Sequence, residues 1–162
     1  MRKPPEPKLS HDPIIRPVVP ADYPQWLPLW QGYNAFYGRF GATTLAEEIT
    51  RMTWSRFFDA GEPVHAMIAE QDGQLVGLVH FIFHRTTISI APTCYLQDLF
   101  TSEAARGNGI ATRLIHAVYE QARLAGCARV YWLTHETNLT ARKLYDQVAE
   151  LSGFVVYRRN LP

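Results

Sequence analysis

The chain has 162 residues, of which 47% are apolar and 19% charged, and its formal net charge is +1. This balance is typical of a globular domain with a sizeable core, and it lacks the basic surplus expected of a nucleic-acid-binding protein. No apolar run reaches the roughly 18 residues of a membrane span, and the first residues, MRKPPEPKLSHDP, have no apolar signal segment. We therefore expect a cytoplasmic protein with no nucleic-acid or membrane partner. Residues 1–12 are expected to form a flexible N-terminal tail and residues 13–162 a single domain.

Cysteine and histidine are sparse and scattered. The two cysteines, Cys94 and Cys127, do not form a CxxC pair, and the six histidines do not form an HExxH motif or a close ligand pair. We expect reduced thiols and no metal site.

The first half of the chain predicts a short edge strand followed by two helices. Residues 14–19 fit a strand at a sheet edge, where Pro17 is tolerated. A helix is expected after Asp22, carrying an aromatic stripe at helical spacing: Trp26, Trp30, Tyr33 and Tyr37. The stripe is either core or a surface that holds a cationic amine by cation–π contact. A second helix is expected after Thr44 and up to Gly61.

The second half predicts strands that alternate with helices. Asp72-Gly73 is a strong hairpin signal between strands at residues 64–71 and 74–85. A third strand (residues 93–102), a helix (109–124), a strand (128–135), a helix (138–151) and a last strand (153–160) follow. This order favours an α/β protein whose mixed sheet has helices on both faces.

Two glycines lie where the helix at residues 109–124 begins, in Arg106-Gly107-Asn108-Gly109-Ile110-Ala111. Glycine lets the backbone approach a ligand closely, and a helix N-terminus presents unpaired N–H groups that suit phosphate. Arg106 adds a charged fork of donors. The turn is therefore either a pyrophosphate site or simply a tight connection.

This segment resembles the Gcn5-related N-acetyltransferase (GNAT) superfamily, whose signature is Arg/Gln-x-x-Gly-x-Gly/Ala. Asn138, Ala141, Leu144 and Tyr145 also match the family's second half, and the resemblance covers about residues 14–160. It is greatest to the branch of fungal histone and polyamine acetyltransferases and their bacterial relatives. The resemblance implies a three-layer fold with a mixed, mostly antiparallel sheet, a splayed parallel strand pair and helices on both faces.

The resemblance implies acetyl-CoA as the cofactor. The backbone of Leu99, Phe100 and Thr101 would pair with the pantetheine amides, and Asn138 would cap a helix and contact the pantetheine arm. The pyrophosphate would be bound by Arg106, Gly107, Asn108, Gly109, Ile110, Ala111 and Thr112.

The resemblance also implies catalytic roles. Tyr145 matches the tyrosine that hydrogen-bonds the departing CoA sulfur, and a phenol with a pKa of about 10 stays protonated at neutral pH. Some relatives carry a glutamate where this chain has Gln97, and a neutral amide cannot act as a base. We favour Asp98 as the base, with Glu136, His84 or a water chain as alternatives. The substrate residues are expected to be Tyr33, Tyr37, Gln97 and Glu136.

These features predict an N-acetyltransferase that moves an acetyl group by direct attack onto a primary amine. The acceptor is left open among a polyamine, an amino acid, a protein lysine and another small amine. The alternatives are a non-catalytic acyl-CoA-binding sensor or scaffold on the same fold, and a nucleotide-binding protein. A strand at the C-terminus would favour a homodimer.

Overall fold

The structure, a computed structural model, describes residues 12–162. Apart from its last residue, the predicted flexible tail lies outside the described residues. The chain divides into two compact units, one that ends at Trp132 and one that spans Leu133–Pro162. Each unit is described by itself, and the single domain expected over residues 13–162 stays a prediction.

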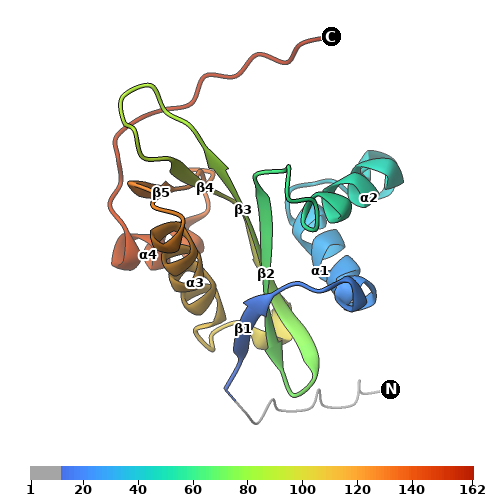
Figure 1. Cartoon of the computed structure of the whole chain (residues 1–162). Helices are drawn as coiled ribbons and strands as arrows, with labels where there is room; N and C mark the ends of the chain where they lie inside the picture. The colour runs from blue at the N-terminus through green and yellow to red at the C-terminus, as the bar shows by residue number, and fades with distance from the viewer. Residues whose placement is uncertain (1–11) are drawn as a thin grey trace, which may run out of the picture. The chain divides into compact units, whose positions relative to one another are not determined.

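The first unit contains a five-stranded sheet with the order β1-β2-β3-β4-β5 (Figure 1). The strands are β1 (Ile14–Pro17), β2 (Val64–Gln71), β3 (Gln74–His84), β4 (Thr93–Thr101) and β5 (Arg129–Tyr131). Neighbouring strands are antiparallel except β4 and β5, which are parallel. The predicted mixed, mostly antiparallel sheet with a parallel pair is confirmed.

The hairpin between β2 and β3 forms at the predicted dipeptide. Asp72 and Gly73 have φ values of 51° and 75°. Two consecutive left-handed residues make the turn that matches the twist of paired strands. Among the described strands, β1 lies at the edge of the sheet and pairs only with β2, so Pro17 lies in an edge strand, as predicted.

Helices cover both faces of this sheet. Figure 1 shows α1 (Tyr23–Phe36) and α2 (Glu47–Arg56) on one side and α3 (Ile110–Leu124) on the other. A Cβ atom at Gly32 of α1 would lie 2.7 Å from the ring of Phe100, and one at Gly77 of β3 would lie 3.0 Å from Ile110. Both glycines are therefore places where a helix packs too closely on the sheet for a side chain.

The aromatic stripe of α1 is mostly core. Trp26, Trp30 and Tyr33 are 0%, 7% and 8% exposed, and they pack with Ile68 and other apolar residues of the sheet. Tyr37 follows the last residue of the helix and is 43% exposed. The core interpretation therefore holds for the first three residues, while the fourth reaches the surface.

One predicted helix start and one predicted helix cap differ from the structure. The second helix begins at Glu47 after Ala46 rather than after Thr44, and it ends at Arg56. Asp22 does precede α1, but its side chain makes no capping bond there. Its carboxylate accepts hydrogen bonds from Arg16 and from the backbone of Val19, and this ion pair outcompetes the cap.

The second unit contains α4 (Leu139–Val148), where Asn138 accepts a hydrogen bond from the backbone of Ala141, as its predicted capping role requires.

The predicted last strand at residues 153–160 is wrong, because residues 149–162 have no regular structure. Strand β5 is also shorter than the predicted residues 128–135. A β-propensity run becomes a strand only where a neighbouring strand pairs with its backbone, and no described strand pairs with residues 153–160.

Replacing Asp22 by asparagine should lower the free energy of unfolding at pH 7 by about 1.5–3 kcal/mol, the range for hydrogen bonds to charged groups. Hydrogen bonds from Arg16 hold the pKa of Asp22 below its ordinary value. That stability is present above the unfolded pKa of about 3.9 and is lost as the pH falls through the lower folded pKa. Urea denaturation at pH 7 and at decreasing pH checks this, and the difference from wild type should shrink below pH ~4. In the control, Glu120→Gln on the exposed ion pair with Arg123 should change little.

Among the helices of residues 12–162, none is both long and apolar enough to cross a bilayer.

Candidate active site

A β-bulge at Gln97 organises the centre of the sheet. His80 pairs with Asp98 and Phe81 pairs with Leu96, which leaves Gln97 as the extra residue of β4. Side chains alternate between the two faces of a strand, so residues three apart normally point to opposite faces. The extra residue removes this offset and places Tyr95 and Asp98 on the same face, the one that carries His80. Gln97 itself is exposed.

Asp98 is buried and lies at the end of a hydrogen-bond chain that runs from Trp26 through His80. The indole Nε1–H of Trp26 donates to His80 Nε2 at 3.1 Å, and His80 Nδ1 lies 2.9 Å from Asp98 Oδ2. Because an indole can only donate, Nε2 is the accepting nitrogen and Nδ1 carries the proton. The neutral imidazole therefore donates to the Asp98 carboxylate, which fixes the orientation of both groups.

Three tyrosines lie close enough to Asp98 for its charge to raise their pKa. Burial raises the pKa of Tyr33, and the charge of Asp98 and a hydrogen bond to it raise that pKa further. Burial followed by the Asp98 charge raises the pKa of Tyr37 and of Tyr95. The three tyrosines thus stay protonated at neutral pH, and a carboxylate near aromatic rings is suited to a cationic amine.

The glycine turn presents free backbone donors. Gly107 and Gly109 have φ values of 80° and 73°, and a Cβ atom on either would meet nothing within 4 Å. Arg113 is the first residue of α3 whose amide reaches a carbonyl, that of Gly109. Among residues 12–162, the amides of residues 107–112 donate to no backbone carbonyl. Two left-handed glycines and a helix N-terminus form a cradle that fits a pyrophosphate.

An open strand edge lies beside this cradle. Strand β4 pairs with β5 only over Thr93–Tyr95, opposite Arg129–Tyr131. Among the described strands, none pairs with the rest of β4 on that side, and Arg106 Nε donates to the carbonyl of Thr101 at its end. Leu99, Phe100 and Thr101 therefore lie on the open length of the strand, as the predicted pantetheine site requires. This edge and the cradle together fit acetyl-CoA.

Three predicted site residues belong to the second unit. The side chain of Asn138 also lies 3.4 Å from Thr134 Oγ1, and the Glu136 carbonyl accepts a hydrogen bond from Arg142. Tyr145 is part of α4. The structure brings Asp98, Tyr33 and Tyr37 together in the first unit, whereas Asn138, Glu136 and Tyr145 are described apart from them.

The other ionisable candidates are less suited to direct chemistry. His84 Nδ1 donates to the Arg85 carbonyl and Nε2 accepts from the Tyr131 hydroxyl at 3.0 Å, so both ring nitrogens are occupied. Burial raises the pKa of Cys94 to about 12, which leaves it a thiol at neutral pH and a poor nucleophile.

His80, Tyr95 and Arg39 also lie near the site and were not predicted from the sequence, whereas Trp26 was predicted as part of the aromatic stripe. A histidine inside the apolar run VGLVHFIFH is a signal that could have identified His80. The sequence carried no signal for Tyr95, because its facing depends on the bulge.

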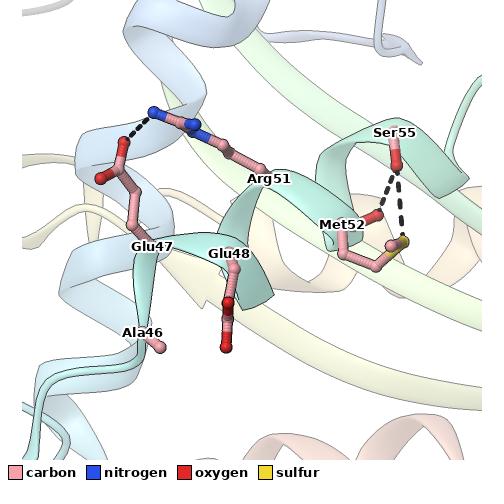
Figure 2. Close-up of a pocket in the computed structure, with 6 residues that line it drawn as sticks. All are labelled: Ala46, Glu47, Glu48, Arg51, Met52 and Ser55. Atoms are coloured by element: carbon pink, nitrogen blue, oxygen red, sulfur yellow. Dashed lines mark hydrogen bonds and ion pairs between the residues drawn. The ribbon is translucent and has the colours of Figure 1, made fainter.

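A shallow recess lies along α2, apart from the candidates named so far (Figure 2). An ion pair between Arg51 and Glu47 crosses it, and the Ser55 hydroxyl donates to the Met52 carbonyl. All its lining residues come from this helix and the residue before it: Ala46, Glu47, Glu48, Arg51, Met52 and Ser55. With one wall supplied by a single exposed helix, it is a surface hollow.

Comparison with known proteins identifies the fold and the chemistry. The pattern of the acetyltransferase (GNAT) family matches residues 26–149. The D-amino-acid N-acetyltransferase HPA3 of Saccharomyces cerevisiae is 30% identical over 158 residues, which is 96% of each chain. The uncharacterized N-acetyltransferase YhfO of Bacillus subtilis is 29% identical over 91% of this chain and 97% of its own.

A solved structure agrees. The aminoglycoside N-acetyltransferase AAC(6')-Iy in complex with CoA superposes with a TM-score of 0.78, at 19% identity, over 96% of this chain and 98% of that one. The signature turn, the open edge of β4 and these relatives lead to one conclusion. This chain belongs to the acetyltransferase (GNAT) family and is an acetyl-CoA-dependent N-acetyltransferase.

Proposed function

We propose that the chain transfers the acetyl group directly to a primary amine, with Asp98 as the base that receives the amine proton and Tyr145 as the acid at the leaving sulfur. The observation that carries this proposal is the buried Asp98 carboxylate of β4, the strand with the open edge. This carboxylate accepts a hydrogen bond from neutral His80 of β3. An amine with a pKa near 10 is mostly protonated at pH 7, so a positioned carboxylate both attracts it and assists its deprotonation.

The donor would be held by main-chain groups. Acetyl-CoA supplies an activated thioester. The amides of residues 107–112 and the Arg106 guanidinium would bind its pyrophosphate, while Leu99, Phe100 and Thr101 would pair with the pantetheine arm. An amide of Leu99 or Phe100 directed at the thioester oxygen would stabilise the charge that develops during attack. Asn138 would contact the arm from the start of α4.

The acceptor would lie against the tyrosines around Asp98. We assign Tyr33, Tyr37, Gln97 and Glu136 to this side of the site. Relatives are named for D-amino acids, aminoglycosides and thialysine, and each of these acceptors carries a primary amine.

We further propose that the protein acts in the cytoplasm as a homodimer. The free thiols Cys94 and Cys127 suit a reducing compartment. Leu151, Phe154 and Val155 are 77%, 90% and 76% exposed at the C-terminus, and an apolar segment of this kind is suited to burial against a second copy. Sedimentation of the full chain against a chain that ends at residue 150 tests the dimer.

The proposed reaction is tested by release of the CoA thiol from acetyl-CoA with a panel of primary amines. Turnover with at least one amine is expected. If CoA binds and no amine reacts, the protein is an acyl-CoA sensor, and if ATP but not CoA raises the melting temperature, it is a nucleotide-binding protein.

Replacing Gly109 by alanine should weaken CoA binding by about tenfold or more, because the Cβ atom and the strained backbone would displace the amides of the cradle. Calorimetric titration with CoA measures this. Gly126→Ala is the matched control: Gly126 has the same φ of 73° and equally open surroundings, but it lies after the other end of α3. Both variants should lose similar stability, and equal loss of CoA affinity in both would contradict the cradle.

A further inference from the structure

Arg39 is the positively charged residue that lies beside the tyrosines of the proposed site, just after α1. Its Nε donates to Asn34 Oδ1 at 2.6 Å, and its backbone amide donates to the Asn34 carbonyl at 2.9 Å. Asn34 is itself 4% exposed, and its Nδ2 donates to the Trp30 carbonyl at 2.8 Å. The guanidinium is therefore oriented by a buried amide, although it follows the end of the helix.

The outer part of this guanidinium is available to a ligand. Its central carbon lies 5.8 Å from the centre of the Tyr33 ring and 5.5 Å from that of Tyr37. Within the described part of the chain, neither Nη group of Arg39 has a hydrogen-bond acceptor and no carboxylate lies at ion-pair distance. An arginine that is held in one orientation and has both terminal nitrogens free can bind a carboxylate through two parallel hydrogen bonds.

The opposite charge acts on the same tyrosine. The charge of Asp98 and a hydrogen bond to its carboxylate raise the pKa of Tyr33, while the Arg39 guanidinium lies over the Tyr33 ring. Tyr33 thus interacts with an anion held by His80 and with a cation held by Asn34. A ligand that carries an ammonium and a carboxylate on one carbon matches this pair of charges in sign.

We propose that the acceptor is a free α-amino acid, whose carboxylate is bound by Arg39 while its amine is directed toward Asp98. This inference rests on the proposed function. A polyamine offers no carboxylate, and its second ammonium would be repelled by Arg39. A lysine side chain in a protein has no free carboxylate beside its amine.

The test compares amino acids with their amides in the full-length enzyme. Alanine and phenylalanine, each as both enantiomers, are assayed with acetyl-CoA beside their carboxamides in wild type and in Arg39→Gln. For at least one amino acid, kcat/KM should fall about tenfold or more in Arg39→Gln, because KM for that amino acid rises. The kcat/KM for the corresponding amide should stay within about twofold of wild type. The kcat/KM of the variant is divided by that of wild type for each substrate separately. This ratio cancels the difference in amine basicity between the amino acid and its amide.

Arg123→Gln is the matched control, since Arg123 is an exposed arginine that pairs with Glu120 on α3. Arg39→Lys should recover part of the preference for the acid, because the charge remains and the two-pronged geometry is lost. Equal losses for acid and amide in Arg39→Gln would overturn the inference. So would wild-type enzyme that acetylates simple amines and shows no activity with any amino acid. The absence of turnover with every amine would instead overturn the proposed function.

Discussion

Replacing Asp98 by asparagine should lower kcat by about two to four orders of magnitude at pH 7, the usual contribution of a positioned base, while CoA affinity stays the same. Asparagine has the same shape and keeps an oxygen to accept the hydrogen bond from His80, so the core around it is expected to persist. The defect should shrink as the pH rises toward the amine pKa of about 10, because an amine that is already neutral no longer needs a base. Steady-state kinetics from pH 6 to 10 and calorimetry with CoA measure both effects.

The matched control for this substitution is Glu120→Gln, which removes an exposed carboxylate of α3 and should leave kcat unchanged. Thermal melting separates a catalytic loss from a folding loss. If Asp98→Asn melts like wild type and retains full kcat at pH 7, Asp98 is not the base, and a water chain or Glu136 takes its place.

Replacing Tyr145 by phenylalanine should lower kcat by about a hundredfold or more with little change in the KM for acetyl-CoA, because the phenol would act on the sulfur only as it leaves. Full proton transfer from a phenol with a pKa near 10 to a thiolate with a pKa near 8.5 is uphill. The effect therefore measures how far hydrogen bonding stabilises the developing thiolate. Thiol release under saturating acetyl-CoA is the measurement.

Tyr119→Phe on α3 is the control, since burial also raises the pKa of that tyrosine and no role in the reaction is proposed for it. A donor thioester with a more acidic thiol should reduce the defect of Tyr145→Phe, because a better leaving group needs less help. A defect that is the same for both donors would show that Tyr145 acts in packing or binding rather than on the leaving sulfur.

Much of the fold follows from local signals. The hairpin at Asp72-Gly73 requires two left-handed residues. Helix α3 starts one residue after the predicted Gly109 and ends at the predicted Leu124, between glycines with φ values of 73° at Gly109 and Gly126. The segment at residues 153–160 has the composition of a strand and forms none. Propensity describes how well a side chain fits a pleated surface, but a strand exists only when another edge pairs with its backbone.

The sequence by itself determined the cradle, because a helix N-terminus after two glycines presents free amides whatever surrounds it, and the family signature is local in the same way. Only the tertiary structure decided what faces Asp98. One unpaired residue, Gln97, shifts the alternation of β4 and brings Asp98 onto the face of Tyr95, His80 and Tyr33. The facing of a side chain in a sheet depends on register with a neighbouring strand distant in sequence, and no local pattern in the chain encodes that register.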